Sequence, residues 1–179
     1  MEVDVSAEQV PPEAGGTSRL YGRMIVLAAV VLIADQASKF WAVSALADER
    51  RITVIPQLLE LRLLYNSGAA FSLGAGATWV FAVTAAVAVA GVLYAGRRLR
   101  SPAWTVVLGV LLGGATTHLI DRLFRAPGFA QGHVVDFIDY GGLFVGNLAD
   151  IALTIGGVML VVLGLRGVPL GGVPREANG

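Results

Sequence analysis

Two aspartates, Asp136 and Asp150, combine features that suit acid–base catalysis. Neither has a lysine or arginine within a helical turn, and apolar residues flank Asp136 on both sides. When two such carboxylates meet in a medium of low dielectric they do not both ionise, so one holds a proton while the other stays a base. The pair titrates as a unit and can activate water for attack on a carbonyl group. We therefore predict that Asp136 and Asp150 form the catalytic dyad of a peptidase.

Other acids have basic neighbours in the sequence. Asp35 and Lys39 are spaced i, i+4 on one helix face, so a structural ion pair is at least as well supported as a catalytic role. Asp121 and Arg122 are adjacent at a predicted helix end, with His118 one turn before them on the same face. We expect this second group to anchor the structure.

The sequence gives little support to other hydrolytic chemistries. It has no cysteine, which excludes disulfides, thiolate nucleophiles and cysteine-bound metals. Its two histidines, His118 and His133, are not part of a His-Glu-x-x-His motif, so a zinc peptidase would lack its ligands. Ser67 and Ser72 lie outside any Gly-x-Ser-x-Gly motif. We predict no metal and no cofactor.

The elements that must position these residues are membrane helices. The chain has 179 residues, of which 55% are hydrophobic and 15% are charged, against roughly 25% charged residues in a soluble domain. A bilayer core of ~30 Å needs about 20 residues of helix. Four stretches poor in charge have that length, at residues 24–43, 74–96, 102–121 and 146–165. We predict an all-α integral membrane protein with four transmembrane helices, and its net charge of +0 gives no reason to expect nucleic acid as a partner.

Arginines in the short segments around these spans predict their orientation, because such residues are retained on the cytoplasmic side. They precede the first span, fill the link between the second and third, and follow the fourth: Arg19, Arg23, Arg97, Arg98, Arg100, Arg166 and Arg175. Both termini are therefore expected in the cytoplasm. We expect residues 1–20 to be a disordered tail, residues 21–168 to form the membrane peptidase domain and residues 169–179 to be a second tail.

The two outer links, residues 44–73 and 122–145, contain strand signals. Residues 52–54 and 59–63 alternate apolar and polar side chains at the period of a half-buried strand. Residues 134–138, followed by Tyr140-Gly141-Gly142, indicate another strand and a turn. We predict a small β-rich element on the outer side of the membrane, with Asp139 as a solvated acid of the turn.

The acids of the spans and of the outer links fall at a similar depth near the outer face. Burying a carboxylate in hydrocarbon costs at least ~2.5 kcal/mol, so each needs a partner or a task. A proton-coupled transporter is an alternative, but it would require a relay of acids across the bilayer instead of a gathering at one face. A structural or assembly subunit, whose aspartates would be salt-bridged, is a third possibility.

Five short motifs resemble, in their order, those of lipoprotein signal peptidase, or signal peptidase II, a family of aspartyl peptidases of bacterial membranes. They are Asp35-Gln36-Ala37-Ser38-Lys39, Asn66-Ser67-Gly68-Ala69-Ala70-Phe71, Gly113-Gly114-Ala115 leading to Asp121-Arg122, Val134-Val135-Asp136-Phe137-Ile138, and Asn147-Leu148-Ala149-Asp150. The match runs from residue 35 to residue 150. Each motif alone would be weak, and their order on four spans is what makes the resemblance specific.

The resemblance implies that Asp136 and Asp150 are the dyad and that a further set lines or braces the site: Asp35, Lys39, Asn66, Gly68, Asp121, Arg122 and Asn147. It implies a prolipoprotein substrate, cut just before a diacylglyceryl-modified cysteine, in contact with membrane lipid. It also implies a multi-pass protein of the bacterial plasma membrane. We expect it to act as a monomer without a cofactor.

Two positions depart from the family pattern. Thr117 and His118 stand where the family has Gly-Asn, and His118 can keep a hydrogen bond of that asparagine while adding a group that titrates near neutrality. Gly146 stands where the family has an aromatic residue, and is expected to loosen packing beside the dyad. A divergent paralogue with weak or altered peptidase activity is therefore an alternative.

Overall fold

The computed structural model describes residues 15–68 and 78–171. Within them the chain forms eight elements, which are, from the N-terminus, α1 (Gly15–Ala45), β1 (Arg51–Ile55), β2 (Leu59–Asn66), α2 (Thr78–Gly96), α3 (Pro102–Phe124), β3 (Val134–Asp139), β4 (Val145–Gly146) and α4 (Leu148–Leu165). Several predicted segments lie partly outside the described residues. They are the two predicted tails, the second predicted span at its start, and the second motif, of which Ala69-Ala70-Phe71 is not described.

The four helices are long and apolar enough, by length and composition, to cross a membrane. Two of them begin elsewhere than the sequence predicted. The first is already helical at Gly15, so the expected disordered tail does not extend to residue 20. The fourth begins at Leu148 and not at Gly146, because Gly146 belongs to a strand and Asn147 caps the helix. The protein is thus mostly helical, with a four-stranded sheet added to the helices.

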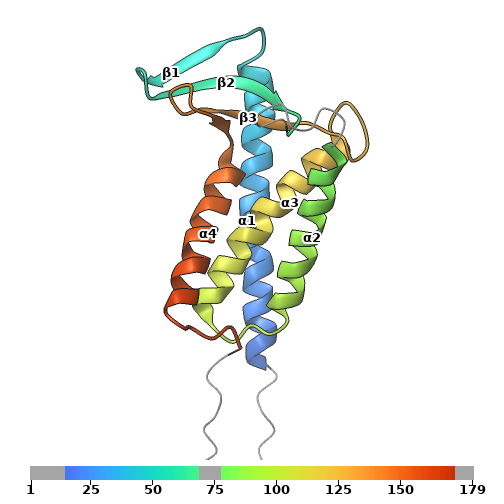
Figure 1. The fold of residues 1–179 in the computed structure, drawn as a ribbon, viewed down its shortest axis with the longest axis vertical. Helices are drawn as coiled ribbons and strands as arrows, with labels where there is room; N and C mark the ends of the chain where they lie inside the picture. The colour runs from blue at the N-terminus through green and yellow to red at the C-terminus, as the bar shows by residue number, and fades with distance from the viewer. Residues whose placement is uncertain (1–14, 69–77, 172–179) are drawn as a thin grey trace, which may run out of the picture.

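Helix α3 is the central helix of the bundle and packs against α1, α2 and α4 (Figure 1). In the most apolar 18-residue stretch of α3, 50% of the residues are buried, against 11–17% in the corresponding stretches of the other three helices. Glycines allow this close approach, because a Cβ on Gly113 would lie 2.8 Å from the Ala28 carbonyl oxygen of α1 and one on Gly114 would lie 2.7 Å from Leu153 of α4. The helix that carries His118, Asp121 and Arg122 is therefore fixed from several sides.

The sheet is antiparallel, with the strand order β1-β2-β3-β4. Its first three strands lie where the sequence predicted them. Strand β4 is a correction to that prediction: Val145 pairs with Asp139, and Gly146 pairs with Ile138. This short pairing returns the chain from β3 directly to the first turn of α4, so the sheet and the last helix share a junction.

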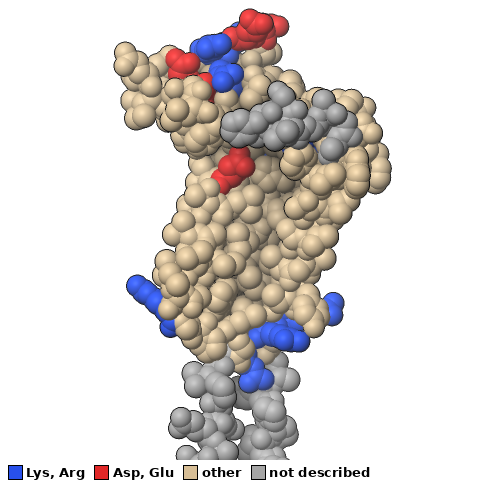
Figure 2. All heavy atoms as spheres, in the orientation of Figure 1, with Lys and Arg blue, Asp and Glu red and all other residues tan. Residues whose placement is uncertain are grey.

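The sheet lies at one end of the helical bundle, and the described chain ends lie at the other (Figure 1). In the face seen in Figure 2, basic side chains gather at the end opposite the sheet, whereas acidic and basic side chains are mixed at the sheet end. Between them the surface carries very little charge. This distribution is typical of a protein whose middle part lies in hydrocarbon.

Candidate active site

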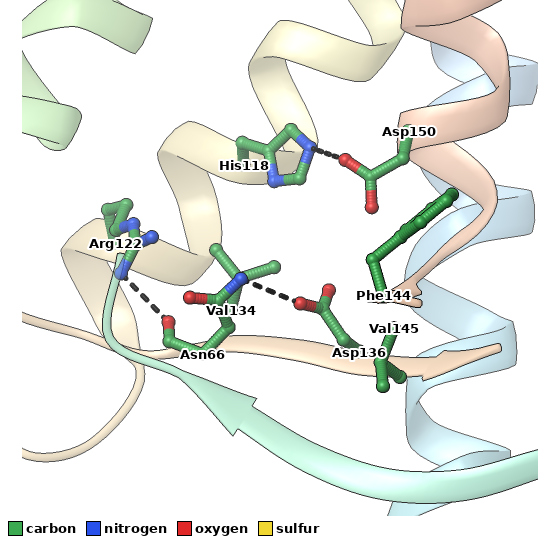
Figure 3. Close-up of a pocket in the computed structure, with 8 residues that line it drawn as sticks. All are labelled: Asn66, His118, Arg122, Val134, Asp136, Phe144, Val145 and Asp150. Atoms are coloured by element: carbon green, nitrogen blue, oxygen red, sulfur yellow. Dashed lines mark hydrogen bonds and ion pairs between the residues drawn. The ribbon is translucent and has the colours of Figure 1, made fainter. Parts of the chain in front are cut away.

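Asp136 and Asp150 line one pocket where the sheet meets the bundle (Figure 3). Strand β3 carries Asp136 and the first turn of α4 carries Asp150. The pocket holds about 330 Å³. Its other lining residues come from β2, α3, β3 and the segment that leads into α4: Asn66, His118, Arg122, Val134, Phe144 and Val145.

Asn147 connects the two aspartates. Its side-chain Nδ2 donates to Oδ1 of Asp136 at 2.6 Å. Its backbone N–H donates to Oδ2 of Asp150 at 2.9 Å, and the backbone N–H of Asp150 donates in turn to Oδ1 of Asn147 at 3.1 Å. This reciprocal pair is a capping box, which satisfies the free N–H groups at a helix start. The residues that begin α4 therefore also fix the relative positions of the two acids.

Asp136 is almost fully buried, at 2% exposure, and no basic side chain among the described residues bonds to it. Its Oδ2 accepts from Nδ2 of Asn66 at 2.8 Å, which adds a second amide to that of Asn147. Burial raises the pKa of the Asp136 carboxyl above its ordinary value. The two amide hydrogen bonds oppose that rise in pKa, and the nearby charge of Asp150 adds to it.

Asn66 is itself held from two directions. Its Oδ1 accepts from the backbone N–H of Gly68 at 2.7 Å, and its backbone carbonyl accepts from Nη1 of Arg122 at 3.0 Å. Gly68 has a φ of 94° and lies against Phe81, where a Cβ would overlap the ring, so glycine is required there. The Arg122 guanidinium also donates to the Gly132 carbonyl at 3.0 Å. Arg122 thus joins two segments that border the pocket.

His118 does not take part in that anchoring, which corrects one prediction. Its ring lies in the pocket, and Nε2 is 3.2 Å from Oδ1 of Asp150 (Figure 3). The side chain of Asp150 is 42% exposed and that of His118 is 19% exposed. Sequence spacing placed His118 near Asp121 and Arg122 on α3, but the contact that it makes is with α4.

A second group of charges lies behind the pocket, and three of its four side chains are completely buried. Nζ of Lys39 lies 2.6 Å from Oδ2 of Asp35 and 2.7 Å from Oδ2 of Asp121, with all three side chains at 0% exposure. The predicted pair of Asp35 and Lys39 is therefore present, and Asp121 completes it. Nε of Arg125 adds a further ion pair to Asp121, at 2.6 Å. We call these four residues the buried ion network.

Neutral groups complete the hydrogen bonds of the buried ion network. The Thr117 hydroxyl donates to Oδ2 of Asp35, and Gln36 donates to both Thr117 and Asp121. The backbone N–H of Ala149 donates to Oδ1 of Asp35 at 2.8 Å. That last bond joins α1 to the first turn of α4, so the network also supports the helix that carries Asp150.

Asp139 is not the solvated turn acid that the sequence indicated. It bonds the Gly142 N–H at 2.7 Å, as a turn acid does, but its side chain is 7% exposed and forms an ion pair with Arg62 on the neighbouring strand β2. The hydrogen bond from Arg62 holds the pKa of the Asp139 carboxyl below its ordinary value. Asp139 therefore belongs to the sheet and not to the pocket.

The pocket adjoins an apolar cavity of about 300 Å³ that is lined by α2, α3, α4 and Val134 of β3. The two share His118, Arg122 and Val134. Small and apolar residues form the rest of the cavity wall: Phe81, Thr84, Ala85, Ala88, Ala115 and Leu153. A ligand that reaches the aspartates can thus place an apolar part next to them.

The arrangement as a whole suits acid–base chemistry on a bound water. One carboxyl is buried among amides, and the other is partly open to the pocket. Across residues 15–68 and 78–171, no three histidine, cysteine or acidic side chains gather closely enough to hold a metal ion. Sequence reasoning did not identify Thr117 as a partner of Asp35, or Gln36, Arg125 and Arg62 as partners of the acids, because each contact joins distant segments or depends on a helix face that the sequence alone does not orient.

The sequence and the fold are similar to those of known proteins. A family model described as "Signal peptidase (SPase) II" matches residues 27–166. A lipoprotein signal peptidase of Rhodococcus jostii (strain RHA1) is 46% identical over 145 residues, covering 81% of this chain and 73% of that protein. One of Bifidobacterium longum subsp. infantis is 48% identical over 143 residues, covering 80% and 78%. A solved structure, titled as a bacterial membrane enzyme at 1.9 Å resolution, superposes with a TM-score of 0.69 at 27% identity, covering 81% of this chain and 94% of that one.

Proposed function

This chain belongs to the signal peptidase II family, and from that premise we propose that Asp136 and Asp150 are the catalytic dyad of a lipoprotein signal peptidase. The family assigns the class of enzyme, an aspartic peptidase of bacterial membranes that removes signal peptides from prolipoproteins. The dyad assignment depends on one observation. Two carboxyl groups from separate elements line the same pocket, and Asn147 bonds to both.

We assign the proton of the dyad to Asp136 and the role of base to Asp150. Burial raises the pKa of Asp136, and its oxygens contact amide groups and no cation among the described residues. Asp150 is more open to the pocket, and its two oxygens face the Asn147 N–H and His118. When two carboxyl groups share one proton and have unequal surroundings, one can act as the acid and the other as the base.

The reaction follows from these roles. The Asp150 carboxylate takes a proton from a water molecule as the water oxygen bonds to the scissile carbonyl carbon, and Asp136 donates a hydrogen bond to the carbonyl oxygen. The tetrahedral intermediate then collapses, the carbon–nitrogen bond breaks, and the proton held by Asp150 passes to the leaving amine. Asp136 keeps its proton at the end, so the dyad is ready for another substrate.

The substrate that we propose is a prolipoprotein cut before a diacylglyceryl-modified cysteine. The pocket lies where the weakly charged surface of the bundle meets the sheet, which is the depth at which a lipid-anchored bond would sit. The adjoining cavity suits apolar residues of the signal peptide, whose central region is apolar. Its two small alanines on α2, Ala85 and Ala88, leave room for side chains of the substrate.

We further propose that the sheet faces the outer side and that both termini are cytoplasmic. The basic side chains at the end opposite the sheet support this orientation (Figure 2). We take residues 21–168 as a single membrane peptidase domain that acts as a monomer. The family assignment argues against the transporter alternative. His118 and Gly146 depart from the family pattern and are the positions at which we expect any difference in substrate range to arise.

The test is cleavage of a diacylglyceryl-modified precursor by the purified enzyme in lipid. Asp136→Asn and Asp150→Asn should each lower kcat at least about 1000-fold, since each removes a proton-transfer group worth 10²–10⁴-fold and leaves its partner uncoupled. Asp139→Asn is the matched control, because it makes the same chemical change outside the pocket and should retain cleavage. Cleavage by either dyad variant at a rate near the wild-type value would refute the assignment.

A further inference from the structure

His118 lies where a titrating side chain would affect the dyad directly. It is one of only two histidines in the sequence, and His133 is not among the residues that line the pocket. Nε2 of His118 approaches Oδ1 of Asp150 at 3.2 Å, and the ring is largely shielded from solvent. Figure 3 shows that it reaches Asp150 from α3, on the opposite side of the pocket from Asp136.

Few charged groups lie close enough to His118 to pair with its ring. Asp150 on α4 contacts it, Asp136 on β3 faces the same pocket, and Arg122 stands one turn along α3. The Arg122 guanidinium is engaged by two backbone carbonyls, and Lys39 of α1 is bound within the buried ion network. From α2, the residues in the adjoining cavity are Phe81, Thr84, Ala85 and Ala88, which do not titrate. Within the described parts of the chain, His118 is therefore paired with Asp150 alone.

The hydrogen bonds of Asp150 indicate what His118 supplies. Oδ2 is fixed by the Asn147 N–H at 2.9 Å, so Oδ1 needs a second donor if the carboxylate plane is to be held. A neutral imidazole with its proton on Nε2 is such a donor. A second proton would go to Nδ1, which leaves the bond to Asp150 in place but adds a positive charge next to it.

We propose that His118 is a positioning residue that orients Asp150 as the base when its ring is neutral and suppresses that base when its ring is protonated. The inference builds on the dyad proposed above. An imidazolium attracts the carboxylate charge, so the carboxylate accepts a proton from water less readily. Activity should therefore be lost as the pH falls and the His118 ring takes up its second proton.

The experiment is the pH profile of kcat/KM on the lipidated precursor for the wild type and His118→Gln. Glutamine can place an amide N–H close to the position of Nε2, so it keeps the donor but does not titrate. We expect the wild type to lose activity about tenfold per pH unit on the acid side, and the glutamine variant to lack this loss until the dyad itself titrates. His118→Ala should be about 10-fold less active across the whole range, because it also lacks the donor. His133→Gln is the matched control and should keep the wild-type profile.

A second measurement needs no change at His118. In His133→Gln without added tags, a single histidine remains, so NMR of labelled imidazole follows His118 directly. Its inflection should coincide with the acid loss of activity, and an inflection more than about one pH unit away would overturn the proposal. The same acid loss in His118→Gln as in the wild type would also overturn it. These outcomes concern His118 only, because the dyad assignment is decided separately by the two aspartate-to-asparagine variants.

Discussion

The molecule contains two groups of buried or half-buried acids that differ in their partners. In the buried ion network, Asp35 and Asp121 each bond to Lys39 at 2.7 Å or less and are wholly buried. In the pocket, Asp136 bonds only amides among the described residues, and Asp150 bonds a backbone N–H and an imidazole. Residue type is the same in both groups, so if the proposed dyad is catalytic, the partner decides whether a carboxylate serves stability or chemistry.

The physical basis of this difference is charge compensation. A buried carboxylate beside a permanent cation is held in its ionised form, so it neither donates nor readily accepts a proton. A carboxyl that receives only neutral hydrogen bonds can hold or release a proton, which a peptidase requires. Removing the basic partner in the first group should therefore lower the free energy of unfolding, whereas removing an acid in the second group should lower the catalytic rate.

The largest expected effect on stability is that of Lys39→Met. It leaves Asp35 and Asp121 buried without their shared cation, which should lower the free energy of unfolding by about 3–5 kcal/mol. Thermal unfolding in detergent measures this loss. Asp136→Asn is the control from the other group and should unfold near the wild-type temperature. Equal losses in the two variants would remove the distinction between the groups.

Neutralising the acids as well sharpens this test. In the variant that combines Lys39→Met with Asp35→Asn and Asp121→Asn, no uncompensated carboxylate remains at the centre of the network. Replacing both sides of a buried ion pair is far less costly than replacing one. The triple variant should therefore recover part of the lost stability, and a further loss would contradict the charge-based account.

A smaller effect is expected at Asn147, which bonds both aspartates of the proposed dyad and caps α4. Asn147→Ala should lower stability by about 1 kcal/mol through the lost cap and lower kcat about 10-fold or more through the lost hydrogen bond to Asp136. Asn147→Ser separates the two roles, because serine can cap a helix without adding a charge, while its shorter side chain does not reach Asp136. We expect it to keep most of the stability and lose activity. Full activity in Asn147→Ser would show that the donor is dispensable.

The smallest effect is expected for the ion pair of Asp139 with Arg62 in the sheet. Arg62 lowers the pKa of Asp139, so the ionised acid stabilises the fold above the unfolded pKa of about 3.9. That contribution is lost as the pH falls through the lower folded pKa. Asp139→Asn should thus cost about 0.5–1 kcal/mol at pH 7 and a smaller amount near pH 3. Unfolding at the two pH values measures it, and a constant difference would assign the effect to packing.

Much of the fold could be predicted from the sequence because its signals are local. Stretches of bilayer length that are poor in charge marked the four helices, and alternation marked β1, β2 and β3. Strand β4 has two residues, too few for any periodic pattern. The start of α4 was nonetheless readable, since Asn147 followed by Asp150 is a capping signal that hydropathy overlooks.

Only part of the site could be predicted, because contacts between distant segments leave no local pattern in the sequence. The absence of nearby basic residues led to the prediction of Asp136 and Asp150 as the dyad, whereas the predicted roles of Asn66 and Asn147 came only from the family resemblance. The partner of Asp139 is Arg62, 77 positions away, and only the pairing of β2 with β3 reveals it. His118 was assigned to its own helix end for the same reason: the rotation of α3 against α4 decides which acid it meets.

Lys39 has one more consequence. It is the only lysine in the sequence, and its side chain is wholly enclosed. Acylation, carbamylation and other reactions of side-chain amines therefore have no accessible target in the folded protein. The amine becomes reactive only when α1 separates from α3, so its chemical modification would mark the opening of the bundle.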